Sequence, residues 1–319
     1  MKRSFFALFL GLMMLSNFAF AQQTETNPTW KNKLYSQMGV DEKIRFVAVK
    51  SDEVLSLFGR TKGDQINAEG LKMIKNYLDG YVRRGSKPKF DSCSSKDWLK
   101  SDLTSILMRG GKNAAALNEE FSAQKLPPQL GIYVAMIESE FCPCLQSSTG
   151  GLGMFQWLVS SGKEYGLNIQ KEATNENSDE RCQPKLAARA TSKYFKKMID
   201  TIFGSDAVGF PLAIGAFNSG EGNKKRHIAE VTAISKAPRI SFWVLIDTQE
   251  ELIEKLDKET AEKPDGDDKK DDETSKIPGY LRQFQEENIK YVPKFFAAAI
   301  IGENPKTFGI NMLPLSQIK

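Results

Sequence analysis

The sequence predicts a mainly α-helical, globular protein, and two observations support this prediction. Apolar residues recur every three to four positions in several segments, as in Leu71, Ile74, Leu78 and Val82, which is the spacing of an amphipathic helix. The composition is 40% hydrophobic and 26% charged, as in a chain that buries a substantial core. The formal net charge of +4 gives little support to nucleic-acid binding.

Residues 1–21 are expected to be a signal peptide. A short basic start precedes an uncharged stretch that ends in Ala19-Phe20-Ala21, a small-x-small cleavage pattern. The alternative is an uncleaved anchor, because the uncharged stretch is at the lower length limit for spanning a bilayer. Residue 22 is Gln and not the Cys of a lipoprotein. We therefore predict a periplasmic or secreted protein with no stable membrane anchor after cleavage.

The segment at 22–65 is polar at first and then mixed, and its role cannot be interpreted from the sequence. The rest of the chain, 66–319, is expected to form one catalytic domain. Pro127 and Pro128 favour a helix start, because proline is tolerated in the first turn. Gly166 is expected to end a helix. Apolar spacing predicts helices, in order, at 67–84, 97–108, 112–121, 129–141, 154–165, 185–203, 210–217 and 291–302.

A charged segment at about 258–275 interrupts this pattern. It contains eight acids and four lysines. Such a composition cannot bury an apolar face, so we expect a mobile, exposed insertion.

The four cysteines are Cys93, Cys142, Cys144 and Cys182. Export favours disulfides over free thiols. Of the three possible pairings, the one that joins Cys142 to Cys144 would close a strained loop, so the two long-range pairings stay open. A metal site is not expected, because the only histidine is His227 and the chain has no pair of Cys-x-x-Cys units.

Glu138 is the candidate catalytic residue. It follows the apolar run 132–137 near the C-terminal end of a predicted buried helix. Desolvation and the negative end of the helix dipole both favour a protonated carboxyl group, as a general acid requires. The alternative is an ordinary surface glutamate near a helix end. Glu140 lies about 200° further around the helix, so the two carboxyl groups should face opposite ways.

Four ordered blocks resemble the motifs of lytic murein transglycosylases, and most closely those of membrane-bound lytic murein transglycosylase D. The resemblance extends over about residues 68–312. The blocks are Ile137-Glu138-Ser139-Glu140-Phe141-Cys142-Pro143 with Ser147 and Gly153-Met154-Phe155-Gln156-Trp157; Asp179-Glu180-Arg181-Cys182-Gln183-Pro184; Ala216-Phe217-Asn218-Ser219-Gly220-Glu221-Gly222; and Glu287 with Tyr291-Val292-Pro293-Lys294-Phe295.

This resemblance implies a lysozyme-like, goose-type helical fold with at most a small β-hairpin. It also implies that Glu138 is the sole catalytic acid and base, cutting the MurNAc-GlcNAc β-1,4 bond of peptidoglycan strands to give 1,6-anhydro products without a cofactor. Tyr291 would place its hydroxyl against Glu138. About one of the residues Met154, Phe155 and Trp157 should face the cleft. The substrate-binding residues implied are Ser147, Gly153, Met154, Phe155, Gln156, Phe217, Asn218 and Tyr291.

The sequence departs from the family pattern at several of these positions. Phe217 replaces a tyrosine, and Met154-Phe155 replaces a Leu-Trp pair. Cysteines replace Asn, Asn and Arg in the blocks, which suggests that Cys142 or Cys144 bridges to Cys182 and pins the loop after the catalytic helix.

These departures keep two other functions open. One is a muramidase that hydrolyses the same bond with water, with a preference for modified or deacetylated glycan. The other is an inactive peptidoglycan-binding scaffold. In each case the expected partner is the glycan strand, and the protein is expected to be a monomer.

Overall fold

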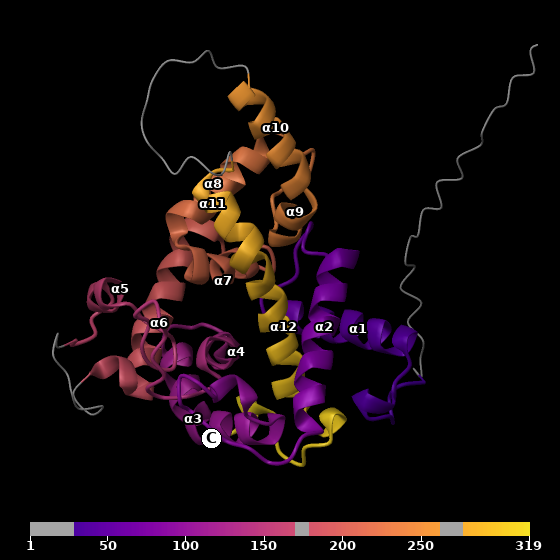
Figure 1. The fold of residues 1–319 in the computed structure, drawn as a ribbon, viewed down its shortest axis with the longest axis vertical. Helices are drawn as coiled ribbons and strands as arrows, with labels where there is room; N and C mark the ends of the chain where they lie inside the picture. Colours follow the sequence, from indigo (N-terminus) through magenta and orange to yellow (C-terminus); the bar gives the residue numbers. More distant parts are fainter. Residues whose placement is uncertain (1–28, 170–178, 262–276) are drawn as a thin grey trace, which may run out of the picture.

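The computed structural model describes residues 29–169, 179–261 and 277–319, so the expected signal peptide at 1–21 lies outside it. The mainly α prediction is confirmed (Figure 1). No helix in these ranges is both long enough and apolar enough to cross a bilayer. The α-helices are α1 Val40–Ser56, α2 Ala68–Gly85, α3 Leu103–Ala123, α4 Pro128–Ser139, α5 Val159–Glu164, α6 Pro184–Met198, α7 Gly209–Ser219, α8 Glu221–Thr232, α9 Phe242–Asp247, α10 Gln249–Ala261, α11 Gly279–Gln283 and α12 Ile289–Glu303.

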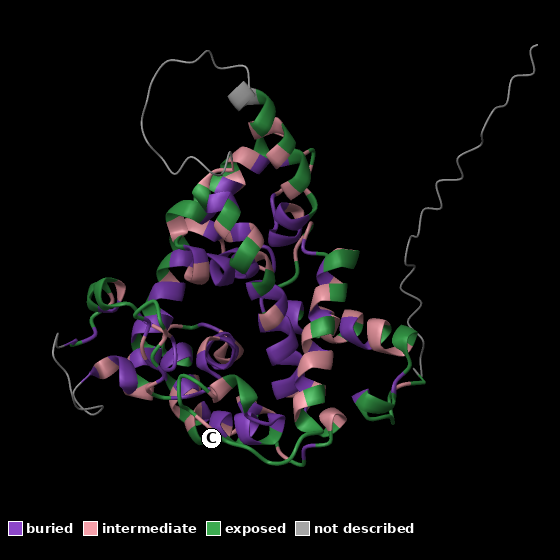
Figure 2. Ribbon diagram, in the orientation of Figure 1, coloured by how far each residue is buried: buried purple, intermediate pink, exposed green. Residues whose placement is uncertain are grey.

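Helix α12 is the central element of the core. It contacts α1, α2, α4 and α7, and its residues from Tyr291 to Gly302 are buried apart from Lys294 (Figure 2). A helix that is apolar on nearly all sides must be covered by its neighbours. Helix α4 is equally buried, between α12 and α3. The two helices that carry Tyr291 and Glu138 are therefore held rigidly against each other.

Two helix predictions agree closely with the structure. Helix α2 begins after Asn67, whose side-chain oxygen accepts a hydrogen bond from the Gly70 N–H at 2.7 Å and so caps the helix. Helix α4 begins at Pro128, as the proline pair predicted.

Two separate helices were predicted at 97–108 and 112–121. The structure has a single helix, α3, without a break between them, so this prediction was wrong. Asp102 caps its start, because its Oδ1 accepts from the Ser105 N–H at 3.0 Å. Gly110 does not interrupt the helix. A Cβ there would lie 2.7 Å from the ring of Phe141, so this glycine permits a close approach of that ring.

The prediction of a helix at 154–165 was also wrong for its first half. Within this range only α5 is helical. Gln156 has a φ of +53°, which an α-helix does not allow. Leu152 and Trp157 instead exchange backbone hydrogen bonds of 3.1 Å. Isolated bridges at Gln146–Leu152 and Leu152–Trp157 are the only β structure among the described residues.

The part of the N-terminal segment that the structure describes packs onto the core. Helix α1 contacts α2 and α12, and Tyr35 and Phe46 are buried beside Phe308. Helix α10 continues to Ala261, so the first residues of the predicted insertion at 258–275 are helical, which corrects its start. Residues 262–276 lie outside the described ranges.

Candidate active site

A cleft with a volume of about 1310 Å³ opens beside the end of α4. Its walls come from the segment 145–158, from α5 and from the C-terminal half of α7. Among the described residues, no cluster of three or more His, Cys, Asp or Glu could hold a metal ion. The lining residues include Ser95, Trp98, Glu138, Ser147, Phe155, Gln156, Trp157, Glu164, Tyr165, Tyr194, Phe217, Asn218, Glu221 and Glu287.

Glu138 lies in the last turn of α4, where the buried helix meets the cleft. Its neighbours Ile137 and Ser139 are buried, and Ser139 donates a hydrogen bond to the Met154 carbonyl at 2.9 Å. Glu138 itself is half-buried. Glu140 and Phe141 have φ values of +51° and +64°, which end the helix directly after this point. The carboxyl group is therefore the part of α4 that faces the substrate space.

The surroundings of Glu138 bring its titration into the neutral pH range. Burial raises the pKa of this carboxyl group to about 7. Two neighbours act in the opposite direction: the Tyr291 hydroxyl donates a hydrogen bond to Oε1, and the positive charge of Lys294 lies nearby. Lys294 is held in place by donating to the Ile137 carbonyl at 2.7 Å. A pKa near 7 lets one carboxyl group both give and take a proton.

Glu140 has a different environment, although it is two residues away. It is 1% exposed and forms an ion pair with Arg84, with 2.8 Å between Nη2 and Oε2. The Arg109 Nε donates to the Glu140 carbonyl oxygen at 3.1 Å. Glu140 does not line the cleft, in agreement with the opposite placement expected from helix geometry.

Ser147 and Gln156 line the cleft and also hold its wall together. The Ser147 hydroxyl accepts from the Gly151 N–H at 2.9 Å. The Gln156 Nε2 donates to the carbonyls of Leu145 and Gly153, each at 2.8 Å. Because these bonds use the amide nitrogen of Gln156, its Oε1 is the atom left to accept a hydrogen bond from a ligand.

The structure corrects the prediction that Gly153 and Met154 contact substrate. Neither residue lines the cleft, and Met154 is completely buried. Gly153 has a φ of +86°, and a Cβ there would lie 1.8 Å from the Arg181 carbonyl oxygen. The glycine is therefore required by the packing of the Arg181 segment behind the wall.

Two aromatic residues of the segment 145–158 line the cleft, although only about one of Met154, Phe155 and Trp157 was expected to do so. Phe155 and Trp157 are largely buried but have edges in the lining. Trp157 is fixed by a 3.0 Å hydrogen bond from Nε1 to the Thr191 hydroxyl. Phe217 also lines the cleft and lies edge-to-face against Trp157, with 5.6 Å between ring centroids. It stacks on Phe195, with 5.3 Å between ring centroids. Phe217 thus offers an apolar edge at this position.

Asn218 is oriented by a buried chain of hydrogen bonds. Lys224 is 1% exposed, and burial lowers its pKa to about 7. Its Nζ donates to the Asn288 Oδ1, and the Asn288 Nδ2 donates to the Asn218 Oδ1 at 3.0 Å and to the Gly215 carbonyl at 2.7 Å. The Gly215 carbonyl can only accept, which fixes the direction of the Asn288 amide and, through it, that of the Asn218 amide. The Asn218 N–H groups therefore point away from Asn288.

Two disulfides, Cys93–Cys142 and Cys144–Cys182, decide between the pairings that the sequence left open. The expected link from one of the two central cysteines to Cys182 is confirmed, and its partner is Cys144. Arg181, beside this link, pairs with Asp179 at 2.7 Å and donates to the Trp157 carbonyl at 3.2 Å. The turn after Glu138 is thus tied to two distant segments.

Sequence reasoning missed several residues of the site. Trp98, Lys224 and Asn288 were not identified, and Glu164 was not considered as part of a cleft. A lysine within an otherwise helical block gives no local sign of burial. Trp98 lies among Lys96, Asp97 and Lys100, where an exposed indole is unusual, and this contrast was the one available signal.

A helical domain with a carboxylic acid of raised pKa facing a long cleft is the arrangement of lysozyme-like glycan-cleaving domains. Comparison with known families supports this class: residues 116–240 match the family model described as Transglycosylase SLT domain. The resemblance to lytic transglycosylases is thereby confirmed, as is the lysozyme-like helical fold. The closer likeness to transglycosylase D stays a prediction.

A similar protein is the peptidoglycan transglycosylase gp16 of Escherichia phage T7. It is 35% identical over 89 residues, which are 28% of this chain. The matched part is 6% of the length of the phage protein, so the similarity concerns one region of that much longer chain.

Proposed function

We propose that this protein cleaves the glycan strands of peptidoglycan at the MurNAc-GlcNAc β-1,4 bond, with Glu138 as the catalytic residue. The observation that carries the proposal is the half-buried Glu138 carboxyl group, which lines a cleft, has a pKa of about 7 and accepts a hydrogen bond from Tyr291. The matches to the SLT domain and to a phage peptidoglycan transglycosylase support the same substrate.

The proposed reaction needs no second carboxylate. Glu138 first gives its proton to the glycosidic oxygen as the bond from C1 to that oxygen breaks. The resulting carboxylate then takes the proton of the muramoyl C6 hydroxyl while that oxygen closes onto C1. The product is a 1,6-anhydro sugar, and the acid is restored. A pKa near 7 suits both steps.

A hydrolytic muramidase is the second candidate, and one observation favours it. Glu164, Glu221 and Glu287 also line the cleft, so carboxylates that could activate a water molecule are present. Inverting glycosidases use such a second carboxylate at about 6.5 to 9.5 Å from the acid. The choice between the two reactions depends on whether water or the C6 hydroxyl reaches C1.

Mass spectrometry of digested sacculi distinguishes these reactions. A transglycosylase gives products lighter by one water that resist borohydride reduction, and this is the expected result. Reducing ends that borohydride converts would establish the hydrolase instead. Binding to sacculi with no soluble product would identify a scaffold and overturn the proposal.

Variants of the additional carboxylates sharpen this test. We expect Glu221→Gln and Glu287→Gln to keep the anhydro product, because the proposed reaction uses Glu138 alone. Loss of product formation in one of them, with binding to sacculi retained, would favour the two-carboxylate reaction.

We also infer export to the compartment that contains peptidoglycan. The sequence of residues 1–21 has the signal-peptide pattern, and the structure contains two disulfides, which persist in oxidising compartments. Amino-terminal sequencing of the protein recovered outside the cytoplasm should give a start near Gln22.

A further inference from the structure

The loop between α2 and α3 places a tryptophan in the cleft. Ser95 and Trp98 line the same cleft as Glu138, and Trp98 begins a 3₁₀ turn, Trp98–Lys100. Of the four tryptophans of the chain, Trp157 and Trp243 belong to the hydrophobic core and Trp30 packs against it. Trp98 does neither and is only half-buried. Its indole ring is therefore available to a ligand.

The two ends of this loop are joined by hydrogen bonds. The Asp102 N–H donates to the Phe90 carbonyl at 2.9 Å, and the Phe90 N–H donates to the Asp102 Oδ2 at 2.8 Å. One step further in, the Ser92 N–H donates to the Ser101 Oγ, and this hydroxyl donates to the Ser92 carbonyl, both at 3.1 Å. The base of the loop is therefore closed independently of its tip.

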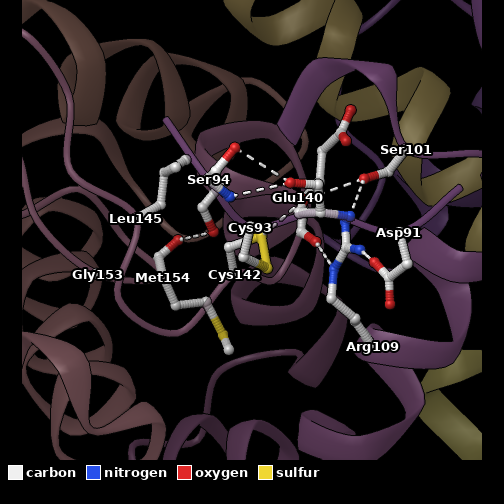
Figure 3. Close-up of a disulfide and its surroundings, with 12 residues drawn as sticks. Asp91, Cys93, Ser94, Ser101, Arg109, Glu140, Cys142, Leu145, Gly153 and Met154 are labelled. Atoms are coloured by element: carbon white, nitrogen blue, oxygen red, sulfur yellow. Dashed lines mark hydrogen bonds and ion pairs between the residues drawn. A yellow bond between two sulfur atoms is a disulfide. The ribbon is translucent and has the colours of Figure 1, made fainter. Parts of the chain in front are cut away.

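A disulfide and an ion pair attach the loop to the catalytic segment (Figure 3). Cys93 is bonded to Cys142, four residues after Glu138. Asp91 pairs with Arg109, and the Arg109 Nε donates to the Glu140 carbonyl at 3.1 Å. These links hold the loop against the turn that ends α4. Trp98 thus has a preset position relative to Glu138, and a preorganised contact loses little entropy when a ligand binds.

We propose that Trp98, with the Ser95 hydroxyl beside it, forms a subsite that stacks against a pyranose ring of an N-acetylhexosamine strand. One face of such a ring carries C–H groups, which suit the flat, apolar indole, and the indole N–H and the serine hydroxyl suit the ring substituents. Trp98 lies outside residues 116–240, so the subsite is an addition to the matched domain. This inference rests on the proposed glycan substrate.

Binding is tested with the full-length mature protein carrying Glu138→Gln, which prevents turnover. Tetra-N-acetylchitotetraose is titrated by calorimetry. We expect Trp98→Ala to weaken binding about tenfold, as for a central aromatic contact, and Trp98→Phe to recover most of the affinity. Leu99→Ala is the matched control, because Leu99 is 56% exposed in the same turn and does not line the cleft. Unchanged affinity in Trp98→Ala would overturn the proposal.

Trp98→Ala could weaken binding by changing the conformation of the loop, so a second measurement uses Trp98→Phe. Ligand binding should change the tryptophan fluorescence of the parent protein, and Trp98→Phe should lose this change while calorimetry still detects binding. A fluorescence change in Trp98→Phe as large as that of the parent would place the stacking at Trp157, which also lines the cleft, and overturn the proposal.

Activity on sacculi separates this inference from the proposed function. With the active enzyme, Trp98→Ala should raise KM about tenfold and leave kcat nearly unchanged. If the parent enzyme cleaves sacculi and Trp98→Ala has the same KM, the subsite proposal alone fails. If the parent neither cleaves sacculi nor binds the tetrasaccharide, both proposals fail.

Discussion

The end of α4 presents two glutamates to two different regions of the molecule. On the cleft side, Glu138 is half-buried, and its closest polar partner is the neutral hydroxyl of Tyr291. On the opposite side, Glu140 is fully buried but paired with Arg84 and close to Arg109. Two residues of the same type, two positions apart, therefore have different environments because their partners differ.

We expect this difference to separate catalysis from stability. A carboxyl group keeps its proton to a higher pH where burial outweighs the effect of nearby positive charge, as it does for Glu138 beside Lys294. A buried carboxylate with a guanidinium partner instead joins two helices, here α2 and the end of α4. We expect the cleft-side residue to control rate and the opposite residue to control folding.

The largest expected effect is the loss of activity in Glu138→Gln. Removing the titrating proton should lower kcat on sacculi by about 10³-fold, since general acid and base catalysis contributes on that order. The melting temperature should stay close to that of the parent. Release of soluble muropeptides measures this effect. A variant that retains a tenth of the parent activity would contradict the role of Glu138.

Glu140→Gln should show the reverse pattern. Breaking the buried ion pair leaves Arg84 without its partner and is expected to cost about 3 kcal/mol of the free energy of unfolding. The folded fraction should still cleave sacculi at nearly the parent rate. Urea denaturation with the disulfides intact measures the stability.

The control for this variant is Glu119→Gln. Glu119 pairs with Lys185 at 2.7 Å on the exposed surface, so its loss should cost less than about 1 kcal/mol. If Glu140→Gln and Glu119→Gln lower the free energy of unfolding equally, the buried ion pair contributes no more to stability than an ordinary surface pair.

On the cleft side, the titration of Glu138 should also make the stability of the protein depend on pH, an effect smaller than the loss of activity in Glu138→Gln. In the unfolded chain Glu138 releases its proton near its ordinary pKa of 4.5, but in the folded protein it holds the proton to about 7. The folded state therefore binds more protons in this window, so stability falls as pH rises through it.

We expect the parent to lose about 3 kcal/mol relative to Glu138→Gln between about pH 4.5 and about pH 8. Urea denaturation of both proteins at these two pH values measures the difference. A constant difference across this range would show that the pKa of Glu138 is not raised in the folded protein.

The smallest expected effect concerns Tyr291→Phe. The tyrosine hydroxyl lowers the pKa of Glu138, so its removal should raise that pKa further. The alkaline limb of the kcat profile should move up by about one pH unit, and kcat should fall about tenfold because the carboxyl group loses its orienting contact. Tyr280→Phe, a buried tyrosine outside the cleft, should change neither quantity. A downward shift of the limb would contradict this account.

Local sequence patterns determined the elements and the catalytic candidate. The spacing of apolar residues predicted α2, α4, α6, α7 and α12, because a helix with one buried face repeats every 3.6 residues. The apolar run before Glu138 predicted a desolvated carboxyl group for the same local reason. These features depend on neighbours within about two turns, which the sequence shows directly.

Tertiary structure decided several positions that no local pattern in the sequence indicates. The contact of Tyr291 with Glu138, 153 residues away, was implied by the resemblance to lytic transglycosylases and by no local pattern. The apolar pattern of 154–165 gave no sign that Gln156 would break the helix or that Met154 would be buried. The pairing of the cysteines, the burial of Lys224 and the position of Trp98 likewise depend on contacts between distant segments. Such contacts are set by the packing of whole helices, which leaves no local period in the sequence.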